Sequence, residues 1–469
     1  MKEEEINKDE SDRRDGRKRI VASCLHPDLH FYRARYMLPM SSPPIEDGAV
    51  LVDNGQIIDL GCATDLRKKY PEATYHDLGE VILLPGLINA HCHLDYTMMR
   101  GKIRSGGSFT NWVKELNRLK FSYREEDFLA AITEGMEELS AWGCTTAVNI
   151  ASFPELIPKL PCKYSVNPSV ECAPTNHQND LSNLNQPTAY SLQPIASIRP
   201  VGRIVTLPLS PLRLWHLMEV MDIRGAKQGE EGMRAVEDFL RKEPRFQGGW
   251  GISPHAPQTV SKELYRSARN MAEGYHVPFC THLAESEEEF EMFTKGSGFL
   301  FDFLKGLGRN MKDCGARSSI QLLLEEDLLP RGALLVHMNI LSKKDRELLA
   351  KRANDFFVIH CPRTHRFFER APFDWKFFHE QGYRLSLGTD SLASNEDFNL
   401  FAEMRAMVAT APELDPEEIL KMVTLHPAAA IGMAGKLGEL SCGAFADMIT
   451  IPFTGALKDV FAAVIASSE

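Results

Sequence analysis

Eight apolar segments that each read as a buried β-strand recur through the middle of the chain. They are VILLPGLINAHCH, TTAVNI, LRLWHLMEVM, GGWGISPH, VPFCTHLAE, ALLVHMNI, DFFVIHCP and YRLSLGTD. Amphipathic stretches lie between them, as in residues 127–142, where Phe128, Ile132, Met136 and Leu139 recur at helical spacing before Gly143. Strands that alternate with helices predict an α/β fold, and eight of them predict a (β/α)8 TIM-like barrel over residues 81–435.

The two ends of the chain have a different pattern. Residues 19–80 contain short β-like pieces and an Asn54-Gly55 hairpin signal, and residues 436–469 contain strands punctuated by glycine. We expect both ends to form one small β-sandwich domain. Residues 1–18 mix both charge signs and predict a disordered leader.

Residues 162–210 do not fit the βα repetition. They are rich in Asn, Gln, Ser and Pro and are longer than an ordinary βα connection, so we interpret them as an inserted loop. The loop is either a lid over the barrel mouth or a solvated excursion, and its composition favours the excursion.

Composition and charge exclude several classes of partner. The 469 residues include 53 Lys and Arg against 64 Asp and Glu, and the net charge of −11 argues against nucleic acid. No run reaches the roughly 18 apolar residues of a membrane span. Ten cysteines without a C-x-x-C pair favour free thiols, hence a cytoplasmic location. We expect a small-molecule partner, and a homo-oligomer is compatible with this composition.

Polar side chains stand at the ends of the expected strands, where a βα barrel carries its functional groups. In LINAHCHLDY, two histidines one residue apart would point to the same face of a strand. Other expected strands also end in imidazoles or carboxylates. The full set is His91, His93, His255, His282 with Glu285 after it, His337 and Asp390.

Three imidazoles and one carboxylate can hold one Zn²⁺ or Fe²⁺ and leave a position for water, as hydrolytic sites do. We predict that His91, His93, His282 and Asp390 are the ligands. A metal-activated water is then the expected attacking group, and Asp390 would accept its proton.

Two further residues are candidates for proton transfer and charge stabilisation. Glu285 could carry a proton to a ring nitrogen of the substrate, although ESEEEFE also reads as the solvated start of a helix. His337 could hydrogen-bond the attacking oxygen, although a histidine in such an apolar strand is also a common core residue. Its position at the strand end favours the functional interpretation.

The segments PGLINAHCHLDYTMMRG, SPHAPQTVS, THLAESEEE, VHMNIL and LGTDSLASN occur in an order that resembles the amidohydrolase superfamily. The resemblance is to the mononuclear branch of aminohydrolases and chlorohydrolases, with cytosine, guanine and adenosine-analogue deaminases, and covers about residues 19–455 apart from the insert. It implies the four metal ligands above, proton shuttling by Glu285, and substrate or hydroxide contacts from His337 and His255. Gln258 stands where the family often has tyrosine. No lysine occurs between residues 248 and 261, which disfavours a second, lysine-bridged metal.

The resemblance implies hydrolytic deamination of an aminated N-heterocycle, a purine-like base or nucleoside, with aminodeoxyfutalosine as one candidate. Arg363 and His365 in HCPRTHRFFERAPF are candidates for substrate binding, and a structural arginine with an exposed histidine is the equal alternative. The competing functions are a chlorohydrolase, a cyclic-amide hydrolase and a non-catalytic barrel.

Overall fold

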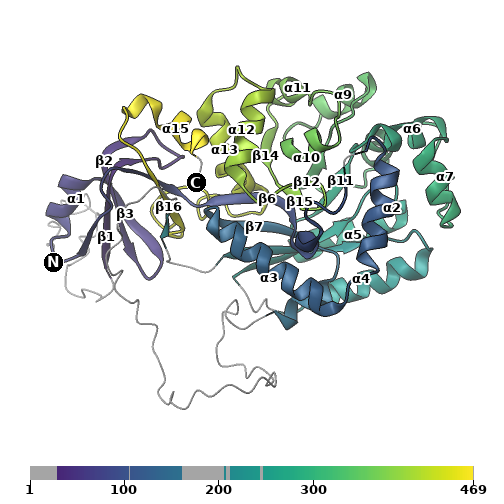
Figure 1. Ribbon diagram of the computed structural model, residues 1–469, viewed down its shortest axis with the longest axis horizontal. Helices are drawn as coiled ribbons and strands as arrows, with labels where there is room; N and C mark the ends of the chain where they lie inside the picture. Colours follow the sequence, from purple (N-terminus) through teal and green to yellow (C-terminus); the bar gives the residue numbers. More distant parts are fainter. Residues whose placement is uncertain (1–28, 105, 161–204, 208–211, 243–246, 468–469) are drawn as a thin grey trace, which may run out of the picture.

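The structure is a computed structural model that describes residues 29–104, 106–160, 205–207, 212–242 and 247–467 (Figure 1). The predicted leader at 1–18 and most of the insert at 162–210 lie outside these residues. Within the described ranges, every helix is too short or too polar to cross a membrane.

Segments from both chain ends lie in one mixed sheet, at the left of Figure 1. Its strand order is β3-β2-β1-β5-β16-β8, and β4 pairs with β1. A sandwich needs a second layer, so that part of the expectation stays a prediction. The strands are β1 (His30–Met37), β2 (Ile45–Asp53), β3 (Gln56–Cys62), β4 (Thr74–Asp77), β5 (Val81–Pro85), β8 (Val205–Leu207) and β16 (Met448–Pro452).

The remaining strands are parallel and form two sheets with the orders β10-β9-β7-β6-β15 and β11-β12-β13-β14. A parallel bridge between Ile252 and Phe279 connects β10 to the segment before β11. At the other edge, Thr389 N donates to His91 O over 3.0 Å. The strands are β6 (Leu87–His93), β7 (Cys144–Ala151), β9 (Arg213–Val220), β10 (Gly248–Pro254), β11 (Cys280–Leu283), β12 (Ala333–His337), β13 (Phe356–His360), β14 (Arg384–Leu387) and β15 (Asp390–Ser391).

Helices follow the parallel strands and pack on them, which confirms the α/β class (Figure 1). Helix α3 buries Phe128, Ile132, Met136 and Leu139, the apolar stripe expected from the sequence. The helices are α1 (Ala63–Lys69), α2 (Phe109–Lys120), α3 (Glu125–Ala141), α4 (Ala226–Leu240), α5 (Lys262–Tyr275), α6 (Glu287–Lys295), α7 (Phe299–Gly306), α8 (Ser319–Glu325), α9 (Lys343–Ala350), α10 (Pro362–Phe367), α11 (Trp375–Glu380), α12 (Leu400–Thr410), α13 (Pro416–Lys421), α14 (Leu425–Ala430) and α15 (Val460–Ala466).

The first expected strand is divided in the structure. VILLPGLINAHCH becomes β5 in the sheet of the chain ends and β6 among the parallel strands, with Gly86 between them. A Cβ atom at Gly86 would lie 2.2 Å from the side chain of Thr145, so only glycine fits at this crossing. Both halves are fully buried, and continuous burial hides the change of sheet from the sequence pattern.

The last residues also differ from the expected β domain. Helix α15 packs against α12 and α13, and Val460, Val464 and Ile465 join the same core cluster as the helices around the parallel strands. The chain end therefore returns to the larger unit after β16.

Candidate metal centre and active site

Three histidines and one aspartate from three strands converge at the carboxyl ends of the parallel strands. His91 and His93 lie on β6, His282 on β11 and Asp390 at the start of β15. The Nε2 atoms of His91 and His93 lie 3.6 and 3.7 Å from Asp390 Oδ1. Ligand atoms of His91, His93 and His282 lie within 4.8 Å of one another, as do those of His91, His337 and Asp390. All these residues are buried, so the structure brings the predicted ligand set together.

The imidazoles have the features expected of metal ligands. Both ring nitrogens of His91 and Nδ1 of His93 are buried without a hydrogen-bond partner. Burial lowers the pKa of His91, and lowers that of His93 well below its usual value, so both rings are neutral and can offer a lone pair. Nδ1 of His282 lies 2.9 Å from the His255 carbonyl oxygen, which leaves its Nε2 for a ligand. These donors fit a divalent metal.

Asp390 is held as a carboxylate. Burial alone would raise its pKa, but the imidazoles of His91, His337 and His93 lower it below the usual value. Its backbone φ is +60°, and His337 and Ala284 also have positive φ angles, of 79° and 51°. Non-glycine residues rarely adopt this conformation, and its concentration here is typical of functional sites.

Glu285 lies two residues beyond β11 and faces the same centre. Its Oε1 lies 3.7 Å from His337 Nε2 and accepts a hydrogen bond of 3.1 Å from Arg370 Nη2. Burial raises the pKa of Glu285, while Arg370 and His282 oppose this shift. This shift favours the protonated form of Glu285, which is the form that a general acid needs.

The acidic run after His282 starts helix α6, and it is solvated only in part, since Glu287 is exposed. Glu285 is 7% exposed and Glu289 is fully buried. Glu289 accepts hydrogen bonds from the backbone of Ala284 and Glu285, and Glu288 accepts one of 3.0 Å from Thr110 N at the start of α2. These acids organise the turn that carries Glu285.

His255 stands at the edge of the centre. Its ring centroid lies 5.1 Å from that of His282, and its Nδ1 lies 2.6 Å from Thr259 Oγ1. Burial lowers the pKa of His255 to about 4, so the ring is neutral. Its Nε2 lies 3.9 Å from Glu219 Oε1. His255 is partly exposed, as a residue in contact with a substrate should be.

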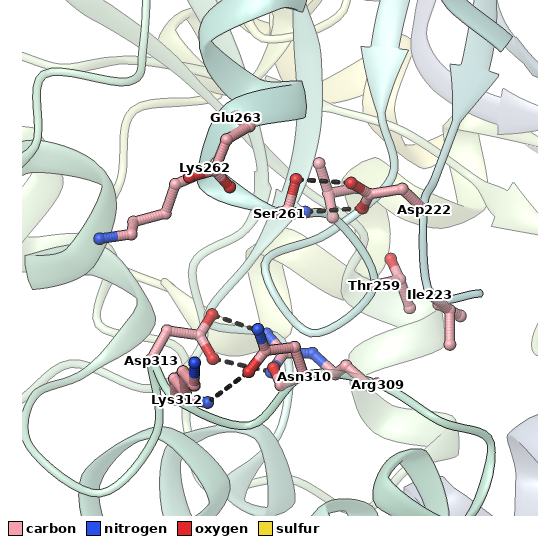
Figure 2. A pocket seen from close by; sticks show the side chains of 11 residues that line it. Asp222, Ile223, Thr259, Ser261, Lys262, Glu263, Arg309, Asn310, Lys312 and Asp313 are labelled. Carbon is pink, nitrogen blue, oxygen red and sulfur yellow. Dashed lines mark hydrogen bonds and ion pairs between the residues drawn. The ribbon is translucent and has the colours of Figure 1, made fainter. Parts of the chain in front are cut away.

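An arginine holds the loop that follows His255. Arg309 Nε donates to Gln258 O over 2.7 Å, and its Nη2 donates to Pro257 O over 3.0 Å. Asp313 pairs with the same guanidinium at 2.8 Å, and Asp222 fixes Ser261 at the end of the loop (Figure 2). The loop is therefore fixed by these contacts as well as by its prolines.

The two predicted substrate-binding residues after β13 have other partners. The Arg363 guanidinium pairs with Glu396 at 2.9 Å and Asp397 at 2.5 Å, which favours its structural alternative. His365 lies 3.1 Å from Asn339 Oδ1, and Asn339 in turn donates to the Glu285 carbonyl oxygen. Asn339 thus links His365 to the backbone of Glu285.

Several residues near the centre were missed by sequence reasoning. Tyr96 stacks on His93 with ring centroids 5.5 Å apart, and Lys120 donates to its hydroxyl. Glu219 near the end of β9 was detectable, because it is the one acid in a mostly apolar strand. Arg370 lies in a loop, and no sequence pattern marks it.

Comparisons with known proteins agree with this geometry. The profile of the amidohydrolase family matches residues 82–466. The chain is 27% identical to a 5-methylthioadenosine/S-adenosylhomocysteine deaminase of Syntrophobacter fumaroxidans, over 87% of this chain and 80% of that protein. It is 26% identical to an aminodeoxyfutalosine deaminase of Deinococcus radiodurans, over 80% of this chain and 79% of that protein.

Solved structures share the fold. The aminofutalosine deaminase of Helicobacter pylori has a TM-score of 0.73 and 19% identity. The match covers 94% of this chain and 96% of that protein. An adenosine deaminase of Xanthomonas campestris with bound zinc has a TM-score of 0.66 and 20% identity, over 94% of this chain and 89% of that protein. The family profile spans most of the chain, and the predicted resemblance is confirmed: this chain belongs to the amidohydrolase family.

Proposed function

We propose that this chain is a metal-dependent hydrolytic deaminase that releases ammonia from the aminated N-heterocycle of a nucleoside-like substrate. The convergence of His91, His93, His282 and Asp390 beside Glu285 is the observation that carries the proposal. The two curated relatives are deaminases named for nucleoside-like compounds, in agreement with the predicted C–N hydrolase. Aminodeoxyfutalosine remains one candidate substrate.

We assign one divalent metal, Zn²⁺ in preference to Fe²⁺, to His91, His93, His282 and Asp390. The buried nitrogens of His91 and His93 without hydrogen-bond partners support this assignment. When bound, the metal supplies a Lewis acid that activates water for attack.

The side chains then divide the proton transfers. Asp390 accepts the proton of the attacking water, and His337 Nε2, 3.9 Å from Asp390 Oδ2, hydrogen-bonds the attacking oxygen. The water oxygen forms a bond to the ring carbon that bears the amine. Glu285 protonates the adjacent ring nitrogen, takes the proton of the added hydroxyl as the oxo group forms, and passes that proton to the amine. The C–N bond breaks, ammonia leaves, and Asp390 returns the water proton to Glu285. His255 is proposed to contact the substrate at the rim.

The finer structural predictions belong to the same proposal. The bridge between β10 and the segment before β11, with the pairing of β15 to β6, supports a closed eight-stranded barrel. The described cysteines Cys62, Cys92, Cys144, Cys280, Cys314, Cys361 and Cys442 are unpaired, which supports a cytoplasmic location. A homo-oligomer stays a prediction.

The experiment is a product screen on zinc-loaded protein. Adenine and cytosine nucleosides, methylthioadenosine, aminodeoxyfutalosine and a chlorinated triazine are incubated with the protein, and ammonia and chloride are measured. We expect ammonia from at least one nucleoside-like compound. Chloride alone would favour the chlorohydrolase, ring opening without ammonia the cyclic-amide hydrolase, and no turnover across the panel would count against the proposal.

A further inference from the structure

Arg370 is a buried cation beside the proposed proton shuttle. Its side chain is 7% exposed, and its Nη2 donates to Glu285 Oε1 over 3.1 Å. The guanidinium carbon lies 4.3 Å from the ring centroid of Phe368 and 5.9 Å from that of Phe109, which comes from α2. Aromatic rings and one carboxylate thus hold the guanidinium in a fixed orientation.

Among the described residues, the other terminal nitrogen of Arg370 has no hydrogen-bond partner. Nη1 is buried, and no described residue offers it a hydrogen-bond acceptor. Leaving a buried charged donor unpaired costs free energy, and sites that bind substrates commonly leave such a donor for the ligand. Because Nη1 and Nη2 share one carbon, the free donor lies directly beside the contact with Glu285.

The position of Arg370 Nη1 determines which substrate atom it can contact. In the proposed reaction Glu285 faces the ring nitrogen next to the amine-bearing carbon, and that carbon must face the metal ligands. We place the carbon on the other side of the same ring nitrogen nearest Nη1, because Nη1 lies beside the Nη2 that contacts Glu285. A guanidinium N–H binds an oxygen acceptor well, whereas a C–H at this carbon offers it nothing.

We propose that Arg370 is a specificity-determining residue that binds an oxo group on the carbon flanking the ring nitrogen contacted by Glu285. The inference rests on the proposed deaminase function and narrows its substrate class. The favoured rings carry an amine and an oxo group on either side of one ring nitrogen, as in 2-oxoadenine or cytosine. A plain adenine ring has only hydrogen at that carbon.

Equilibrium binding of two probes that cannot release ammonia separates this inference from the reaction. Purine riboside and 2-oxopurine riboside, which lack the amine, are titrated by calorimetry into the zinc-loaded protein. We expect the oxo probe to bind at least tenfold more tightly, the effect of a hydrogen bond to a charged donor. The kcat/KM ratio of 2-oxoadenosine to adenosine should show the same preference.

Two variants test whether Arg370 itself binds the oxo group. Arg370→Lys keeps a positive charge for Glu285 but lacks the planar fork, so the preference should fall to about one. Arg366→Met, on the exposed part of α10, is the matched control and should keep the preference. If Arg370→Lys keeps the full preference, Arg370 is only a counter-ion of Glu285 and the inference is wrong.

The remaining outcomes are also decisive. Equal binding of the two probes, or binding of neither, would overturn the inference even if the protein deaminates other nucleosides. A preference for the oxo probe that Arg370→Lys abolishes, together with no ammonia from any compound, would support the inference and refute the proposed reaction.

Discussion

Three of the four proposed ligands contribute an imidazole to the centre, and the fourth is the carboxylate of Asp390. His91 has two buried nitrogens without partners, and His282 is oriented by the His255 carbonyl. We expect His91→Ala or His282→Ala to abolish both metal retention and activity, because too few ligands remain. Metal analysis of stripped and reconstituted protein is the measurement, with exposed His379→Ala as control. Full occupancy in either ligand variant would refute this ligand set.

Glu285 should be needed for proton transfer but not for holding the metal. Glu285→Gln keeps the size of the side chain and removes its ionisable proton, so kcat should fall about 10²–10⁴-fold. Metal content should stay unchanged. Steady-state kinetics on the substrate found in the ammonia screen, with metal analysis of the same preparation, provide the test. Turnover close to wild type would remove Glu285 from the mechanism, and loss of metal would make it a ligand.

The residues detectable from the sequence are those whose position follows from strand geometry. His91, His93, His282 and His337 lie in the last three residues of apolar strands, and Asp390 follows the end of β14 by three residues. Parallel strands bring these carboxyl ends together. Other contacts depend on how loops and helices pack. Arg370 reaches Glu285 from a segment 85 residues later in the chain, and no local pattern encodes that approach.

At the scale of elements, the turn between β11 and α6 depends on Glu289. Its carboxylate accepts hydrogen bonds from Ala284 N at 2.9 Å, Glu285 N at 2.8 Å and Ser319 Oγ at 2.5 Å. Burial nevertheless raises the pKa of Glu289 to about 7. A carboxyl whose pKa is raised in the folded state stabilises the fold at low pH, and this contribution is lost as pH rises from about 4.5 to about 7.

Replacing Glu289 by glutamine should therefore flatten the dependence of stability on pH. The shift corresponds to roughly 3 kcal/mol in the free energy of unfolding. Urea titrations of wild type and Glu289→Gln between pH 4.5 and 7 would measure the difference, with exposed Glu287→Gln as a control on the same helix. Parallel profiles for wild type and Glu289→Gln would mean that Glu289 does not titrate in this window.

Element boundaries were predictable where polarity changes and unpredictable where it does not. The stripe of α3 and the strand β9 follow from apolar spacing. The division of residues 81–93 into β5 and β6 does not, because both halves are buried on both faces. Gly86 is the physical cause of that crossing, since any larger residue would collide with Thr145.

At the scale of the whole molecule, a buried ion pair connects the sheet of the chain ends to the parallel strands. Arg213 at the start of β9 donates from Nε to Asp447 Oδ2 over 2.6 Å, and the Asp447 carbonyl accepts from Gly86 N at the crossing. The two side chains are only 10% and 6% exposed. Residues more than 200 positions apart in sequence thus hold the two units together.

Removing one member of this ion pair should lower the free energy of unfolding far more than removing both members. Arg213→Met leaves the Asp447 carboxylate buried without its main cation, and we expect a loss of about 3–5 kcal/mol in the free energy of unfolding. Asp447→Leu alone should be similarly destabilising, because it removes the carboxylate that pairs with the buried Arg213 guanidinium. The double variant removes both members of the buried pair, so it should be more stable than either single variant. Denaturant unfolding of all four proteins gives the coupling energy directly.

Lys227→Met, at an exposed ion pair with Glu231, is the matched control and should change stability by less than about 1 kcal/mol. Additive losses in the double variant would show that the two charges do not stabilise the junction as a pair.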